Sequence, residues 1–97
     1  MVTFDSFVTF DSEKDLVRFR CHYQEHLVLC AVTRAALVAD TQEPVKTRDA
    51  LLKLYELRSE AIQRAVLNRL LSNPQARHSV IVIGADEIYQ LKRAKHG

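Results

Sequence analysis

The fold is decided first by residues 16–23, which read Leu16-Val17-Arg18-Phe19-Arg20-Cys21-His22-Tyr23. Apolar and polar residues alternate along this stretch, and a period of two is typical of a strand with one face buried and the other in water. A second, more apolar run follows at residues 27–32, after the interruption Gln24-Glu25-His26. The two runs together predict a β-hairpin.

The register of this hairpin is left open by its turn, which contains neither Asn-Gly nor Asp-Gly. A slip of one residue would exchange the residues of the second strand that face the core. Whether Cys21 lies opposite Cys30 therefore stays open at the level of sequence.

A direct repeat precedes the hairpin: Val2-Thr3-Phe4-Asp5-Ser6 is followed by Val8-Thr9-Phe10-Asp11-Ser12. Two copies are too few for a solenoid, which needs about three stacked units or more. We expect the second copy to form a short strand and residues 1–6 to be a loose leader.

Two helices are predicted after the hairpin. Thr33 can cap a short helix at residues 34–39, because its hydroxyl can accept from the N–H groups of the first turn. A long helix should begin at Thr47 or Asp49 and run to Ser72, where Asn73-Pro74 ends it. At 100° per residue its apolar side chains form one stripe that we expect to pack on the sheet, namely Leu51, Tyr55, Ile62, Ala65 and Val66, flanked by Leu54, Ala61 and Leu70.

The chain returns to a strand at residues 79–83, whose continuous β-branched run predicts a central strand covered on both faces. Gly84 should end it, and Asp86 and Glu87 suit the first turn of a final short helix that reaches residue 90 or 92. We expect residues 93–97 to be a loose tail. The predicted fold is one α+β domain over residues 1–97: a small antiparallel or mixed sheet with a hairpin, packed against one long amphipathic helix, plus two short helices.

Several segments resemble a small bacterial family known as domain of unknown function 1488. The resemblance is carried by residues 10–19, by Cys30-Ala31-Val32-Thr33-Arg34-Ala35-Ala36-Leu37, by Tyr55, Arg58 and Ile62, and by the final strand with Ala85-Asp86-Glu87-Ile88. It covers most of the chain from Phe10 to Ile88. The resemblance implies a bacterial source and a sheet packed on a long helix, and it implies no activity.

Composition limits the classes of function. With 47% hydrophobic and 27% charged residues, the chain has the composition of a typical globular domain. Its apolar runs are far shorter than a membrane span, which needs about 20 residues. Acidic Asp5 stands where a secretory signal would carry a cation, so we expect a cytoplasmic protein. A net charge of +2 argues against a dedicated non-specific nucleic-acid binder.

The residues Arg18, Arg20 and His22 share one face of the predicted first hairpin strand, with His26 at the turn. They form a candidate cationic surface for a phosphate or an acidic partner, although an ordinary solvated sheet face has the same pattern. Arg58 falls inside the apolar stripe of the long helix, where a charge must be paired or must reach out to water. A structural ion pair is the favoured interpretation, and ligand anchoring is the alternative.

Three further features of the sequence are candidate sites, and each also has a simpler explanation. Leu57, Leu67 and Leu71 lie outside the apolar stripe, so they can meet the short helices or another subunit, and we favour a homodimer.

The side chains of four residues could in principle bind zinc: Cys21, His22, His26 and Cys30. Because Cys21 and His22 point to opposite faces of a strand, buried thiols are expected instead. Gly84-Ala85-Asp86 lacks the further glycines of a nucleotide-binding turn.

The sequence therefore predicts a non-enzymatic binding or regulatory module, with no catalytic, cofactor or metal-ligating residue and no membrane contact. Its partner would be an unidentified protein or a second copy of the chain. One alternative is a weak nucleic-acid binder that uses Arg18, Arg20 and the tail cations Lys92, Arg93 and Lys95. A second alternative is a thiol-dependent enzyme at Cys21 or Cys30.

Overall fold

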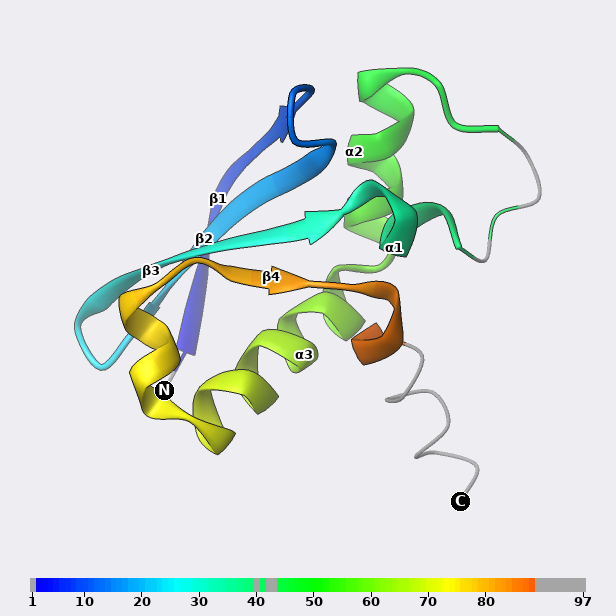
Figure 1. The fold of residues 1–97 in the computed structure, drawn as a ribbon. Helices are drawn as coiled ribbons and strands as arrows, with labels where there is room; N and C mark the ends of the chain where they lie inside the picture. The colour runs from blue at the N-terminus through cyan, green and yellow to red at the C-terminus, as the bar shows by residue number, and fades with distance from the viewer. Residues whose placement is uncertain (1, 40, 42–43, 89–97) are drawn as a thin grey trace.

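A four-stranded mixed sheet forms one layer of the protein (Figure 1). This is a computed structural model, and it describes residues 2–39, 41 and 44–88. The strands lie in chain order across the sheet, with antiparallel pairing among the first three and parallel pairing of the third and fourth. They are β1 (Val2–Asp11), β2 (Leu16–Tyr23), β3 (His26–Thr33) and β4 (Ile81–Ile83).

Helices form the second layer and complete the predicted α+β class. The described residues contain α1 (Arg34–Val38), α2 (Arg48–Leu57), α3 (Ser59–Ser72) and the 3-10 helix η1 (Pro74–His78). The expected cap at Thr33 is confirmed, because its hydroxyl accepts from the Ala36 N–H at 3.1 Å. Of the two caps considered for the next helix, Thr47 and Asp49, it is Thr47 whose hydroxyl accepts from the Ala50 N–H, also at 3.1 Å. In the part of the chain that the structure describes, no helix is long and apolar enough to span a membrane.

The hairpin between β2 and β3 is confirmed, and the structure fixes its register. Cys21 pairs with Val28 and Phe19 pairs with Cys30, so both thiols lie on the inner face but not directly opposite each other. Gln24 and Glu25 form the turn with φ values of 50° and 66°. Positive φ at both turn residues matches the right-handed twist of the strands, and here two residues without glycine adopt it.

The expected loose leader is wrong for residues 2–6, because both copies of the repeat belong to β1. Val2 pairs with Tyr23, Val8 pairs with Phe19, and the register shifts between Phe4 and Val8. Each copy alternates apolar and polar residues, and the period of six is even, so both copies turn their valine and phenylalanine toward the same face. The sheet can therefore bury both, with a bulge at residues 5–7 between them.

The single long helix is also corrected, because the chain breaks it at Arg58. This residue has φ −104° and ψ 8°, and it separates α2 from α3, which run in different directions (Figure 1). The break lets α2 cover β1 and β2 beside α1, while α3 packs under β4 and η1. The predicted apolar stripe survives the break: Leu51, Tyr55, Ile62, Ala65, Val66 and Leu70 are buried, and Ala61 packs against the same core.

The final strand is at the edge of the sheet rather than in its centre. In β4 the buried Ile81 and Ile83 alternate with the exposed Val82, so only one face of the strand is covered. The continuous β-branched run could not distinguish a strand buried on both faces from one that exposes two of its valines. The next turn is helical at residues 85–88, as expected, whereas its predicted continuation and the predicted tail lie outside the described residues.

Candidate interaction surface on the sheet

The outer face of the sheet, opposite the helices, exposes a group of large apolar side chains. Pairing of β3 with β4 places Leu29 and Val80 near each other and Ala31 beside Val82. The exposed fractions are 50% for Leu27, 51% for Leu29, 44% for Val80 and 38% for Val82. We call these four residues the outer patch. They alternate along their strands with core residues, so the same sheet that builds the core also builds this surface.

The predicted cationic residues lie beside the outer patch on β2, but two of them are neutralised. Arg18 forms an ion pair with Asp11 at 2.8 Å, and Arg20 forms one with Asp5 at 2.6 Å. The guanidinium of Arg20 also lies over the Phe7 ring, 4.4 Å from its centroid. The bulge at residues 5–7 brings both partners to Arg20. This part of the outer face is therefore closer to neutral than the sequence predicts.

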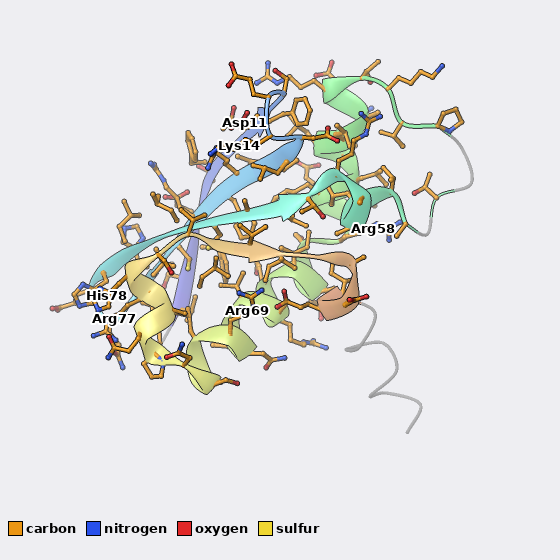
Figure 2. All side chains as sticks on the ribbon, in the orientation of Figure 1. Asp11, Lys14, Arg58, Arg69, Arg77 and His78 are labelled. Carbon is orange, nitrogen blue, oxygen red and sulfur yellow. The ribbon has the colours of Figure 1, made fainter. Side chains whose placement is uncertain are left out.

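These ion pairs change the acidity of the two carboxyl groups. The side-chain hydrogen bond from Arg18, together with the Lys14 N–H, lowers the pKa of Asp11 (Figure 2). At Asp5 burial raises the pKa, but the Phe7 N–H and the Arg20 side chain outweigh it, so the pKa is lowered. Both carboxylates are held in the charged form that their arginines require.

A shallow hollow adjoins the outer patch near the hairpin turn. Its volume is about 170 Å3, and its walls combine apolar and polar side chains from β3, from the end of η1 and from the two residues between η1 and β4: Leu27, Leu29, Arg77, His78, Ser79 and Val80. Figure 2 places Arg77 and His78 together at this end of the sheet. Neither residue stands out in the sequence. The one local signal is that η1 begins at Pro74 after the N-cap Asn73, and this does not predict where η1 packs.

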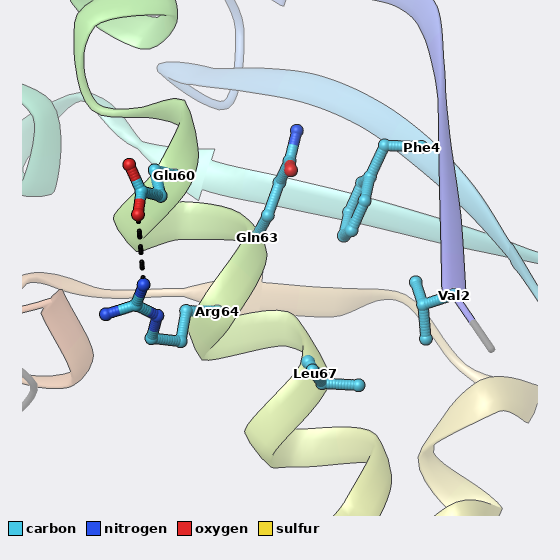
Figure 3. Close-up of a pocket in the computed structure, with 6 residues that line it drawn as sticks. All are labelled: Val2, Phe4, Glu60, Gln63, Arg64 and Leu67. Carbon is cyan, nitrogen blue, oxygen red and sulfur yellow. Dashed lines mark hydrogen bonds and ion pairs between the residues drawn. The ribbon is translucent and has the colours of Figure 1, made fainter.

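A larger groove of about 460 Å3 lies at the opposite edge of the sheet from β4, between β1 and α3 (Figure 3). Val2, Phe4 and Leu67 supply its apolar surface, and Gln63 lies between them and an ion pair of Glu60 with Arg64 at 3.0 Å. Figure 3 shows this pair at the edge of the groove. The pair joins exposed neighbours on one helix, where such pairs are common. None of the described residues that line the groove is a buried polar residue that could orient a small ligand.

The two cysteines are free thiols sealed in the core. Cys21 and Cys30 are both buried, and each points from the sheet toward the helices. Their mutual side-chain hydrogen bond raises the pKa of Cys30, burial adds to that rise, and the same hydrogen bond lowers the pKa of Cys21. Among the described residues no group of three or more His, Cys, Asp or Glu side chains is placed to hold a metal ion. Cys21 and His22 point to opposite faces, as predicted.

Arg58 binds the chain between α1 and α2. Its Nε donates to the Leu37 carbonyl at 2.9 Å and its Nη2 lies 3.5 Å from the Thr41 hydroxyl. Arg58 thus joins the break between α2 and α3 to the end of α1, which supports a structural role (Figure 2). It is not near Arg18, Arg20 or His22 on the outer face.

The surplus leucines of the helices do not form one surface with the outer patch. Leu57 is 81% exposed on α2 and Leu71 is also exposed on α3, while Leu67 is half-buried in the groove beside β1. Gly84 is followed by a helical turn at residues 85–88. A homodimer through these leucines stays a prediction.

Comparison with known proteins identifies the fold. No protein-family model matches the sequence, and no curated protein matches it. The structure is similar to the crystal structure of a protein of unknown function of the domain of unknown function 1488 family from Shewanella loihica PV-4. The TM-score is 0.71 at 17% sequence identity, over 84% of this chain and 90% of that chain. The chain therefore shares its fold with a bacterial protein of that family, as the resemblance in the sequence predicts.

Proposed function

We propose that this protein is a non-enzymatic module that binds another protein through the outer face of its sheet. The observation that carries the proposal is the outer patch: Leu27, Leu29, Val80 and Val82 are exposed together on the sheet face opposite α2 and α3, where the end of η1 forms one border. Contiguous apolar patches larger than roughly a few hundred Å2 are rare on monomeric proteins, and they often mark sites of interaction.

The architecture supports this choice of surface. A two-layer domain buries one face of its sheet under helices, and the other face is normally lined by polar side chains. In β1 and β2 the outer face largely follows that rule, since Thr9, Arg18 and Arg20 occupy it, and its exposed apolar residue Phe7 lies under the guanidinium of Arg20. In β3 and β4 it does not. A surface that changes from polar to apolar across one sheet, with a polar border, has the arrangement of a protein interface.

Nucleic-acid binding is the less favoured alternative. Arg18 and Arg20 would have to leave Asp11 and Asp5 in order to contact phosphates, and the aromatic ring nearest to them, Phe7, is engaged by Arg20. Electrostatic binding to nucleic acid weakens steeply as salt rises. A titration of duplex and single-stranded DNA at low salt that shows no binding would remove this alternative.

A thiol-dependent enzyme is less favoured still. A nucleophilic thiol needs access to substrate and a nearby base, and Cys21 and Cys30 are buried among apolar side chains. A general hydrolase or thiol-transfer assay of the purified protein tests the enzyme class directly. Activity that survives replacement of both cysteines would rule out these thiols as its nucleophile.

The proposal can be tested by site-specific crosslinking in the native cell. A photoreactive amino acid placed at Leu29 should crosslink to a discrete protein, which is then identified and purified. Binding of the purified partner should be lost in Leu29→Ser and retained in Leu57→Ser, which removes an equally large exposed leucine from α2. If Leu57→Ser abolishes binding and Leu29→Ser does not, the interaction surface is on the helices and the proposal is wrong.

A further inference from the structure

The hollow beside the outer patch has the size of a contact for one side chain. Its volume of about 170 Å3 is below the range of about 300–1,000 Å3 in which small-molecule pockets fall. Leu27, Leu29 and Val80, which are three of the four residues of the outer patch, supply its apolar surface. Protein interfaces concentrate their binding energy where one anchor side chain enters such a hollow. The hollow is therefore suited to an apolar anchor residue of a partner.

Donors of hydrogen bonds border the hollow on its η1 side. Arg77 donates from Nη1 to the Pro74 carbonyl at 3.0 Å, and it has no carboxylate partner among the described residues. Its Nε is buried and has no hydrogen-bond partner in the described part of the chain, so a carboxylate from outside would have to bind the Nη groups instead. His78 is exposed at the same border, with its ring 6.1 Å from that of His26. The corner thus holds a cation whose hydrogen-bonding capacity is incompletely used.

Among the residues that the structure describes, no carboxylate forms an ion pair with Arg77 or His78. On the outer face Asp5 is already bound to Arg20, and Asp11 is bound to Arg18 at the opposite end of β2. The corner differs in this respect from Arg69, which binds Glu87 through two nitrogens and donates to the Val82 carbonyl. A carboxylate of a partner protein could form with Arg77 an ion pair of the kind that Glu87 forms with Arg69.

We infer that the partner presents a short segment in which an aspartate or glutamate stands next to an apolar anchor residue. The anchor enters the hollow between Leu29 and Val80, and the carboxylate accepts from Arg77 and His78. This inference rests on the proposed function, because it assigns the chemistry of the partner to the same surface. A second copy of the chain fits less well, since its outer face would bring the same donors and carboxylates that are already paired.

A phage-displayed library of random peptides, selected on the purified protein, is the appropriate probe. Enriched peptides should contain an acidic residue within two positions of a large apolar residue. In fluorescence anisotropy Arg77→Met should raise their Kd by about tenfold or more, as expected for loss of a charge-assisted hydrogen bond. Arg64→Met, which removes an exposed arginine from α3, should leave the Kd unchanged, and Arg77→Lys should recover part of the affinity.

The outcomes separate the inference from the proposed function. Peptides that lose binding in Leu29→Ser but lack acidic residues, or are insensitive to Arg77→Met, overturn the inference and leave the proposed function standing. Peptides that bind Leu29→Ser as well as the unchanged protein overturn both. Sedimentation that shows a dimer dissociated by Leu29→Ser would make a second copy the occupant and would also overturn the inference. Circular dichroism of each variant checks that the fold is retained.

Discussion

The same substitution at two adjacent residues of β4 should have very different effects on the stability of the protein. Ile83 is 0% exposed on the inner face, and Val82 is 38% exposed on the outer face. Threonine is compatible with a strand and keeps the branch at Cβ in both cases. Ile83→Thr and Val82→Thr therefore differ mainly in the environment of the hydroxyl that they introduce.

The expected magnitudes follow from burial. Ile83→Thr replaces a buried ethyl group by a hydroxyl, which removes about 1.6 kcal/mol of transfer free energy at about 0.8 kcal/mol per CH2. A buried hydroxyl without a partner costs about 1–3 kcal/mol more. We expect a loss of about 3–4 kcal/mol in the free energy of unfolding, and a fall in Tm of at least about 12 °C. Val82→Thr exchanges a partly exposed methyl for a hydroxyl, and should change stability by about 0.5 kcal/mol or less.

Urea denaturation followed by circular dichroism measures the free energy of unfolding of both variants, and thermal melts measure their Tm. Binding of the partner should show the inverse order, because Val82 belongs to the outer patch and Ile83 does not. Equal and large losses of stability in the two variants would show that β4 is covered on both faces. That result would refute the exposure of the outer face of β4, on which the proposed function depends.

Three further predictions concern the ion pairs, the caps and the thiols. The pKa of Asp11 is lower in the folded than in the unfolded protein, so the unfolded state binds more protons in acid, and stability should fall as pH drops below about 4. In melts recorded at several pH values, Asp11→Asn should reduce this loss of stability in acid. An unchanged loss in the variant would contradict the role of Arg18. Thr47→Ala removes the cap of α2 and should cost about 1 kcal/mol, seen as a Tm lower by about 4–8 °C, whereas Thr47→Ser should retain most of it. Cys21 and Cys30 should react with a thiol reagent only at the rate of opening of the core, so labelling should be slow in buffer and fast in urea; rapid labelling in buffer would contradict their burial.

Much of the local structure could be predicted because its signals are themselves local. The alternation at residues 16–23 defines a strand and its buried face, and the threonine caps at Thr33 and Thr47 fix where two helices begin. The apolar stripe of the predicted helix names the residues that become buried. Each of these follows from spacing within a few residues along the chain, which does not depend on what packs against it.

The corrections all concern relations between distant segments. β1 is ten residues long because β2 offers both copies of the repeat a place to pair, and the bulge that joins them is set by Arg20 opposite residues 5–7. The break at Arg58 is stabilised by the Leu37 carbonyl, twenty-one positions earlier in the chain. No periodicity within one element contains such information, since tertiary packing selects among several conformations that local sequence allows.

The sequence by itself determined the class of fold, the hairpin and the inner-face core, because apolar spacing decides which side of each element avoids water. Only the tertiary structure decided that β4 is an edge strand, that Val80 and Val82 join Leu27 and Leu29 on an uncovered face, and that Asp5 and Asp11 neutralise Arg20 and Arg18. The physical reason is that exposure and charge pairing belong to surfaces assembled from separate segments, so they exist only once those segments are placed side by side.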